Sequence, residues 1–214
     1  WTPLVASANY DLPFTMGHEF SGEVEAVGKF VKNFKKGDRV AGETHIPCGY
    51  CRECRTDNQH ICTNHMGVLG RTVDGSFAEY IKIPEISAIK LADDANFEHM
   101  SLLEPMGTAL HALQKAEPSG KIVAVLGVGT IGLMACELAK LLGAFKVIAM
   151  DVNEKRLAHS LSLGADIAIN GLNTDLVKAV MNETNGQGVD CVLDFTGNVK
   201  VINQAIDILA PTGI

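Results

Sequence analysis

Four of the six cysteines lie close together, at a spacing that is typical of a metal site. Cys48, Cys51 and Cys54 are separated by two residues each, and Cys62 follows eight positions later. Four thiolates from one short loop can converge tetrahedrally on a zinc ion. Disulfides and an iron–sulfur cluster are the alternatives, but no export signal opens the sequence and no proline follows the last cysteine. We predict a closed structural zinc site that leaves no coordination position for a substrate.

A glycine-rich segment from Gly127 to Gly132 has the pattern of a dinucleotide-binding loop. It follows a continuous apolar run and precedes a helical pattern. In such a loop the first glycine makes a tight turn, the second lets a pyrophosphate approach the backbone, and the third packs helix against strand. The N-terminal amides of the helix would bind the phosphates. The residues predicted to bind the cofactor here are Gly127, Gly129, Thr130, Ile131 and Gly132.

Asp151 ends the next apolar run, 19 residues after Gly132. A carboxylate at that place can accept hydrogen bonds from both hydroxyls of an adenosine ribose. Because a 2′-phosphate would meet a like charge there, Asp151 favours NAD over NADP. Arg156 weakens this preference for NAD, since its guanidinium could neutralise the 2′-phosphate of NADP. The alternative is that Asp151 caps the helix that follows it.

His18 and Glu19 offer an imidazole and a carboxylate that could bind a second metal ion. An isolated His-Glu pair is more often ordinary polar structure than a pair of ligands. Here the pair lies in the run Gly17-His18-Glu19-Phe20-Ser21-Gly22. The same chain also carries a four-cysteine loop and a dinucleotide loop, and this combination indicates a catalytic metal centre.

The two halves of the chain differ in the elements that they predict. Residues 17–91 are rich in glycine, with short apolar runs between turn signals, which favours short antiparallel strands. After residue 121, continuous apolar runs alternate with helical patterns, which favours parallel strands joined by crossover helices in a doubly wound α/β sheet. Strands are predicted at 122–126, 146–150, 166–169 and 189–193, and helices at 131–142, 154–163, 175–183 and 199–209.

These patterns divide the chain into two predicted domains. Residues 1–115 would form a β-rich catalytic domain with the zinc lobe at 45–65, and residues 116–214 a dinucleotide-binding domain. A helix predicted at 97–113 would bridge them.

Composition limits the classes of partner. Lys and Arg together number 18 against 25 Asp and Glu, a net charge of -7, which excludes a strong attraction to nucleic acid or to anionic membranes. The longest apolar stretch, residues 122–128, is shorter than the ~18 residues that a membrane span needs. We therefore expect a cytoplasmic protein that acts on a small molecule.

The motifs together resemble the zinc-dependent medium-chain dehydrogenases, over essentially the whole chain. The resemblance rests on the segment from Gly17 to Gly28, the four-cysteine loop and the loop from Gly127 to Gly132. Within the family, the bacterial and archaeal L-threonine 3-dehydrogenases are the most similar. The segments that carry this finer resemblance are Glu43-Thr44-His45-Ile46-Pro47-Cys48, Gly75-Ser76-Phe77-Ala78-Glu79-Tyr80 and Leu103-Glu104-Pro105.

The resemblance implies a role for each candidate residue. His18 would ligate a catalytic zinc, and Glu19 and Glu104 would ligate it directly or exchange with its water. His45 would lie near the substrate, and Asp151 and Arg156 would contact the adenosine ribose of NAD. Two alternatives stay open: His45 as a polar loop residue and Glu104 as a charge on a helix surface. Structural zinc would be bound by Cys48, Cys51, Cys54 and Cys62.

The resemblance also implies a fold and a reaction. The β-rich domain would be GroES-like and the parallel sheet of Rossmann type. The enzyme would oxidise a secondary alcohol with NAD, L-threonine to 2-amino-3-oxobutanoate being the leading reaction, as a dimer or tetramer of identical chains. Oxidation of a polyol such as sorbitol or butanediol is one alternative, and a zinc-stabilised nucleotide-binding module without turnover is another.

Two positions depart from the family pattern. Members carry a catalytic cysteine ligand upstream of the Gly-His-Glu motif, whereas no cysteine precedes Gly17 here. The turn at residues 211–214 would also open a further strand. We therefore expect the chain to be a fragment that lacks both ends. Thr108 follows Gly107 where threonine dehydrogenases usually have asparagine, which keeps polyols open as substrates.

Overall fold

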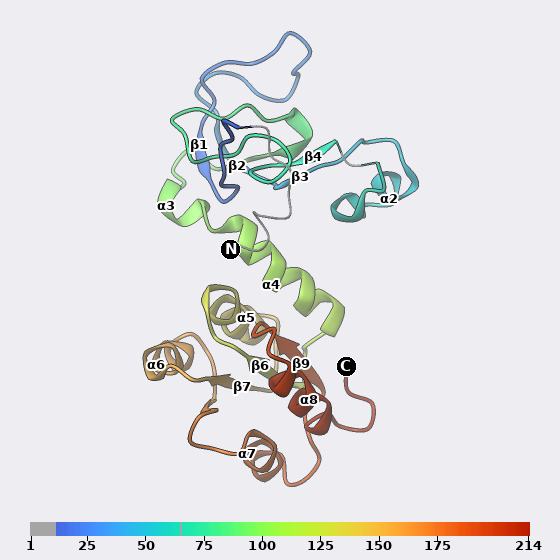
Figure 1. Ribbon diagram of the computed structural model, residues 1–214, viewed down its shortest axis with the longest axis vertical. Coiled ribbons are helices and arrows are strands. Elements are labelled where there is room, and N and C mark those ends of the chain that lie inside the picture. The colour runs from blue at the N-terminus through green and yellow to red at the C-terminus, as the bar shows by residue number, and fades with distance from the viewer. Residues whose placement is uncertain (1–11, 65) are drawn as a thin grey trace. The chain divides into compact units, whose positions relative to one another are not determined.

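The computed structural model describes residues 12–64 and 66–214, which belong to two compact units, Trp1–Glu104 and Pro105–Ile214 (Figure 1). Residues 1–11 of the predicted catalytic domain and residue 65 at the end of the predicted zinc lobe lie outside the described part. The functional division after residue 115 stays a proposal. Among the described helices, none is long and apolar enough to cross a membrane.

The second unit is built on a parallel sheet of four strands. They lie in the order β8-β7-β6-β9, and all three neighbouring pairs are parallel. β6 and β7 are buried almost throughout, which explains their continuous apolar runs. The bounds are β6 Ile122–Leu126, β7 Lys146–Asp151, β8 Ile167–Asn170 and β9 Cys191–Asp194.

Helices cover both faces of this sheet, as the alternation of patterns predicts. Val123 and Val125 of β6 belong to the core that includes side chains of α4, α5 and α6. Ala124 and Leu126 point into the opposite core, with side chains of α7 and α8. The helices are α4 Leu103–Ala116, α5 Thr130–Leu141, α6 Glu154–Ser162, α7 Leu176–Glu183 and α8 Val199–Asp207.

Two glycines in the left-handed conformation end the first two crossover helices. Gly143, with φ +87°, follows α5, and Gly164, with φ +102°, follows α6. Both φ values fall where residues with a Cβ are strained, so each helix stops where the chain must turn back to the sheet.

The single helix predicted at 97–113 is wrong, because the segment forms two helices. They are α3 (Phe97–Met100) and α4, separated by Ser101 and Leu102. Pro105 has no N–H to donate to the Ser101 carbonyl, and its ring would clash with that carbonyl in a continuous helix. Pro105 is instead accommodated in the first turn of α4, where no such bond is needed.

The first unit has short antiparallel strands, as predicted for residues 17–91. β1 (Ser21–Glu23), β2 (Arg39–Gly42) and β5 (Ala88–Lys90) form one sheet in the order β1-β2-β5. β3 (His45–Ile46) pairs with β4 (Gly67–Val68). The cysteine loop adds α2 (Arg52–Arg55) and a helical turn at Gln59–Ile61, and a second turn, Glu85–Ser87, precedes β5.

A close approach of two backbone segments positions the Gly-His-Glu motif. Gly75 N–H donates to the Thr15 carbonyl at 2.7 Å, and Ser76 N–H donates to the Gly17 carbonyl at 2.9 Å. A Cβ on Gly75 would come within 2.0 Å of the Gly17 oxygen. Only glycine allows this approach, so Gly75 holds the segment from which His18 projects.

We expect Gly75→Ala to lower the free energy of unfolding by about 1–3 kcal/mol, because the added methyl group must displace the backbone at Gly17. Urea unfolding measures the loss. Gly28→Ala is the matched control, since a Cβ at Gly28 meets nothing within 4 Å. Equal stability of the two variants would show that Gly75 does not hold the Gly17 segment.

Candidate functional site

The four cysteine sulfurs of the lobe form a cluster that fits one zinc ion. Cys48 Sγ lies 3.9 Å from Cys54 Sγ, and Cys51 Sγ lies 3.8 Å from Cys62 Sγ. All four sulfurs lie within 4.8 Å of one another. A tetrahedron with Zn–S bonds of ~2.3 Å has edges of ~3.8 Å, so the sulfurs already have the spacing that zinc requires. None of the four forms a disulfide in this structure, and the sulfur separations of 3.8 and 3.9 Å are those of metal ligands rather than of an S–S bond of ~2.05 Å.

Backbone N–H groups within the loop point at the sulfurs. Cys48 N–H donates to Cys62 Sγ at 3.3 Å, and Cys51 N–H donates to Cys48 Sγ at 3.4 Å. The backbone N–H of Cys54 lowers the pKa of the Cys51 thiol to about 6, whereas burial raises the pKa of the Cys54 thiol. Because zinc binds thiolates, these donors prepare the loop to hold the metal.

A second cluster joins His18, Glu19 and Glu104. Their ligand atoms all lie within 4.8 Å of one another, although Glu104 is far from the other two in the sequence. His18 and Glu104 are half-buried and Glu19 is exposed. Glu104 belongs to the first turn of α4. One imidazole and two carboxylates are a donor set that suits zinc, so the three residues fit the catalytic metal that the resemblance implies.

Two residues that form hydrogen bonds with candidate site residues were not predicted from the sequence. The Thr44 hydroxyl donates to Glu104 Oε1 at 2.9 Å. Glu43 Oε1 lies 2.7 Å from His45 Nδ1 and accepts the His45 backbone N–H at 3.0 Å. Both residues adjoin His45 in the chain, and that adjacency was the only available signal. Glu104 is therefore not a free charge on a helix surface.

His45 is not one of the three clustered ligands. It begins β3 and lines a cavity of about 340 Å³ that Glu43, Asp57 and His60 also line. Its proximity to a substrate stays a prediction.

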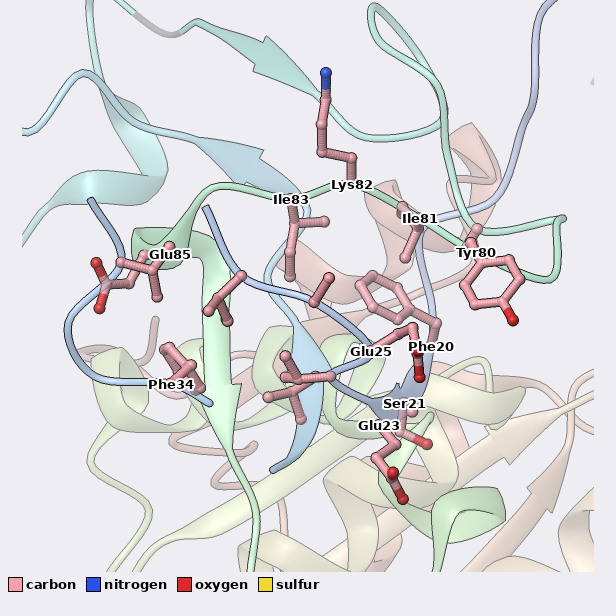
Figure 2. A pocket seen from close by; sticks show the side chains of 18 of the residues that line it. Phe20, Ser21, Glu23, Glu25, Phe34, Tyr80, Ile81, Lys82, Ile83 and Glu85 are labelled. Atoms are coloured by element: carbon pink, nitrogen blue, oxygen red, sulfur yellow. The ribbon is translucent and has the colours of Figure 1, made fainter. Parts of the chain in front are cut away.

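A second cavity of the first unit lies elsewhere. It measures about 470 Å³, and the apolar side chains that line it come mainly from Phe20, the loop after β1 and residues 78–83. In Figure 2, Phe20, Ile81 and Ile83 are seen along this cavity, while the Lys82 chain extends away from the other labelled side chains. None of the residues that line it is His18, Glu19 or Glu104. The cavity is thus separate from the candidate metal centre.

The dinucleotide loop has the geometry that its three glycines predict. Gly127 has φ +87°, as a tight turn after β6 requires. A Cβ on Gly132 would come within 2.0 Å of the Gly127 oxygen, so α5 packs directly on the loop. A Cβ on Gly129 would meet nothing within 4 Å, and no described side chain caps α5 there. The start of α5, at Thr130 and Ile131, can therefore accept an anion.

Asp151 is tied to this loop. Its Oδ2 accepts the Val128 N–H at 2.9 Å, and its Oδ1 accepts the N–H groups of Val152 and Asn153. The side chain is only 6% exposed, and Arg156 Nη1 lies 3.8 Å from Oδ2. Asn153 caps α6, so Asp151 is not the cap of that helix. The structure thus gives Asp151 a second task that sequence analysis missed, which is to hold the loop at the end of β6.

We expect Cys51→Ser to lose one zinc per chain and to unfold the lobe, because a structural zinc contributes on the order of 10 kcal/mol. The metal content after dialysis measures the loss of zinc, and a thermal unfolding curve measures the loss of stability. Cys136→Ala is the control, since Cys136 is buried in the core of the other unit. A Cys51→Ser protein that stays folded with its zinc complement intact would refute the structural zinc site.

Two family models match the sequence. The alcohol dehydrogenase GroES-like domain matches residues 3–93, and the zinc-binding dehydrogenase model matches residues 130–214. The L-threonine 3-dehydrogenase of Caldanaerobacter subterraneus subsp. tengcongensis is 45% identical over 94% of this chain. The chain spans 58% of the length of that relative.

Solved structures agree with these matches. Alcohol dehydrogenase TADH from Thermus sp. ATN1 has a TM-score of 0.88 at 36% identity, with 94% of this chain and 60% of that chain covered. Galactitol-1-phosphate dehydrogenase from Escherichia coli also has a TM-score of 0.88, at 33% identity, with 97% and 60% covered. The GroES-like unit with its four-cysteine lobe and the parallel-sheet unit therefore place this chain in the zinc-binding medium-chain dehydrogenase family.

Proposed function

We propose that the protein is a zinc- and NAD-dependent dehydrogenase that oxidises the secondary alcohol of L-threonine to give 2-amino-3-oxobutanoate. The observation that carries this proposal is the clustering of His18, Glu19 and Glu104 within 4.8 Å. The chain spans only 58% of the matched relative, so the activity belongs to the full-length polypeptide that contains these residues.

The residues of the cluster have separate tasks. Bound zinc would supply a Lewis acid that polarises the substrate hydroxyl. His18, held by the Gly17 segment, presents an imidazole nitrogen, and Glu104 presents a carboxylate at the start of α4. The Glu43 carboxylate fixes the His45 ring through Nδ1 at 2.7 Å. His45 Nε2 is then the ring nitrogen available to carry a proton from the substrate toward water.

NAD is the proposed cofactor. Gly129 leaves space for a pyrophosphate beside the N-terminus of α5, whose partial positive charge favours phosphate. Asp151 places a buried carboxylate beside this loop, and a 2′-phosphate would be repelled by it. Arg156 is about half-exposed and only 3.8 Å from that carboxylate, so it offsets part of the repulsion.

Threonine is the leading substrate, and a polyol is the second candidate. Threonine is supported by relatives that carry this activity in their names at 40–45% identity. Glu19 and Glu104 also give the centre negative charge that suits a substrate ammonium. A polyol is favoured by Thr108, which departs from the threonine dehydrogenase pattern, and by the likeness to galactitol-1-phosphate dehydrogenase. The assembly into a dimer or tetramer stays a prediction.

Initial rates of the full-length protein with L-threonine, sorbitol and 2,3-butanediol, each with NAD and with NADP, test the proposal. We expect the highest kcat/KM for threonine with NAD. His18→Ala should lower that rate at least ~100-fold, since a metal ligand is removed, and should keep the zinc of the four-cysteine lobe.

His99→Ala is the matched control, because His99 is an exposed histidine on α3 of the same unit and should leave the rate unchanged. A higher kcat/KM for a polyol would show that the substrate is a polyol and not threonine. Absence of turnover with every alcohol would favour the non-catalytic nucleotide-binding module instead.

A further inference from the structure

One buried hydroxyl is aimed at a candidate metal ligand. Thr44 is 5% exposed, and its Oγ1 donates to Glu104 Oε1 at 2.9 Å. The two residues lie 60 positions apart in the sequence, so chain proximity does not bring them together. Threonine is branched at Cβ and has few accessible χ1 rotamers, which keeps its hydroxyl in one direction.

The backbone around Thr44 is fixed on both sides. Its carbonyl accepts the Leu69 N–H at 2.9 Å, and the preceding Glu43 N–H donates to the Ser87 carbonyl at 2.8 Å. The Ser87 hydroxyl donates to the His45 carbonyl at 3.0 Å. Leu69 and Ser87 are both fully buried. Thr44 therefore presents its hydroxyl from a rigid support, whereas Glu104 has a flexible side chain that needs an external partner to be held.

We infer that Thr44 is a positioning residue for the catalytic metal, acting through Glu104. The inference rests on the proposed function, because it takes His18, Glu19 and Glu104 as the metal centre. A carboxylate has two oxygens, and the one that accepts the Thr44 hydroxyl is the poorer metal ligand. The hydroxyl thus directs Glu104 to bind through its other oxygen and fixes the direction of approach.

This arrangement also links the metal centre to His45, which is proposed to lie near the substrate. Glu43 holds the His45 ring, and Thr44 holds the Glu104 carboxylate. Residues 43–45 are consecutive in the chain. A shift of this short segment would move both groups together. Thr44 is therefore expected to matter for metal binding even though it offers no ligand atom to the metal.

The test is the zinc affinity of the full-length protein, measured by competition with a chromophoric chelator. The zinc of the four-cysteine lobe is the internal reference, since Thr44 is not one of its four candidate ligands. We expect Thr44→Val, which keeps the shape and removes the hydroxyl, to weaken the second zinc by about 10–100-fold. Thr44→Ser, which keeps the hydroxyl, should restore most of the affinity. If valine prevents folding, Thr44→Ala makes the same test.

A double-mutant cycle separates positioning from general packing. In a Glu104→Ala background, Thr44→Val should have no further effect on the residual zinc affinity, because its partner is gone. An equal loss in both backgrounds, or unchanged affinity in Thr44→Val, would overturn the inference while leaving the proposed function intact. A wild-type protein with only the lobe zinc would instead overturn the proposed metal centre, and this inference with it.

Discussion

The candidate metal centre depends on a backbone approach that only glycine permits. Gly70 and Gly75 both face the backbone of Gly17, where a Cβ would come within 2.3 Å and 2.0 Å of its carbonyl oxygen. This contact fixes the segment that carries His18 and Glu19. Glu104 reaches the same place from the first turn of α4. The centre thus depends on three segments that are far apart in the sequence: residues 17–19, residues 70–75 and the first turn of α4. It can form only when the unit is folded.

The structural zinc lobe supports the same region. Cys48 follows β3 with one residue, Pro47, between them, and β3 begins at His45. Holding Cys48 in the sulfur cluster therefore limits the movement of Glu43, Thr44 and His45.

The parallel sheet was predicted well because its signals are local. Continuous apolar runs predicted the bounds of β6 and β7 to within one residue. The interruption of the helix at Ser101 and Leu102 was missed because residues 97–113 have a helical pattern throughout, and Pro105 was not taken as a signal that one helix ends before it. Glu104 was assigned to the metal cluster only through resemblance, since no periodicity relates it to His18. Thr44 and the loop contact of Asp151 were missed because hydrogen bonds between distant residues leave no pattern in the sequence.

The most direct test is anomalous X-ray scattering at the zinc edge from crystals of the full-length protein. We expect two zinc positions per chain. One should lie at ~2.3 Å from the sulfurs of Cys48, Cys51, Cys54 and Cys62, and the other at about 2.0–2.2 Å from His18 and a carboxylate oxygen of Glu104. A zinc-saturated crystal with a single peak, among the four sulfurs, would contradict the claim that His18 and Glu104 form a catalytic metal centre.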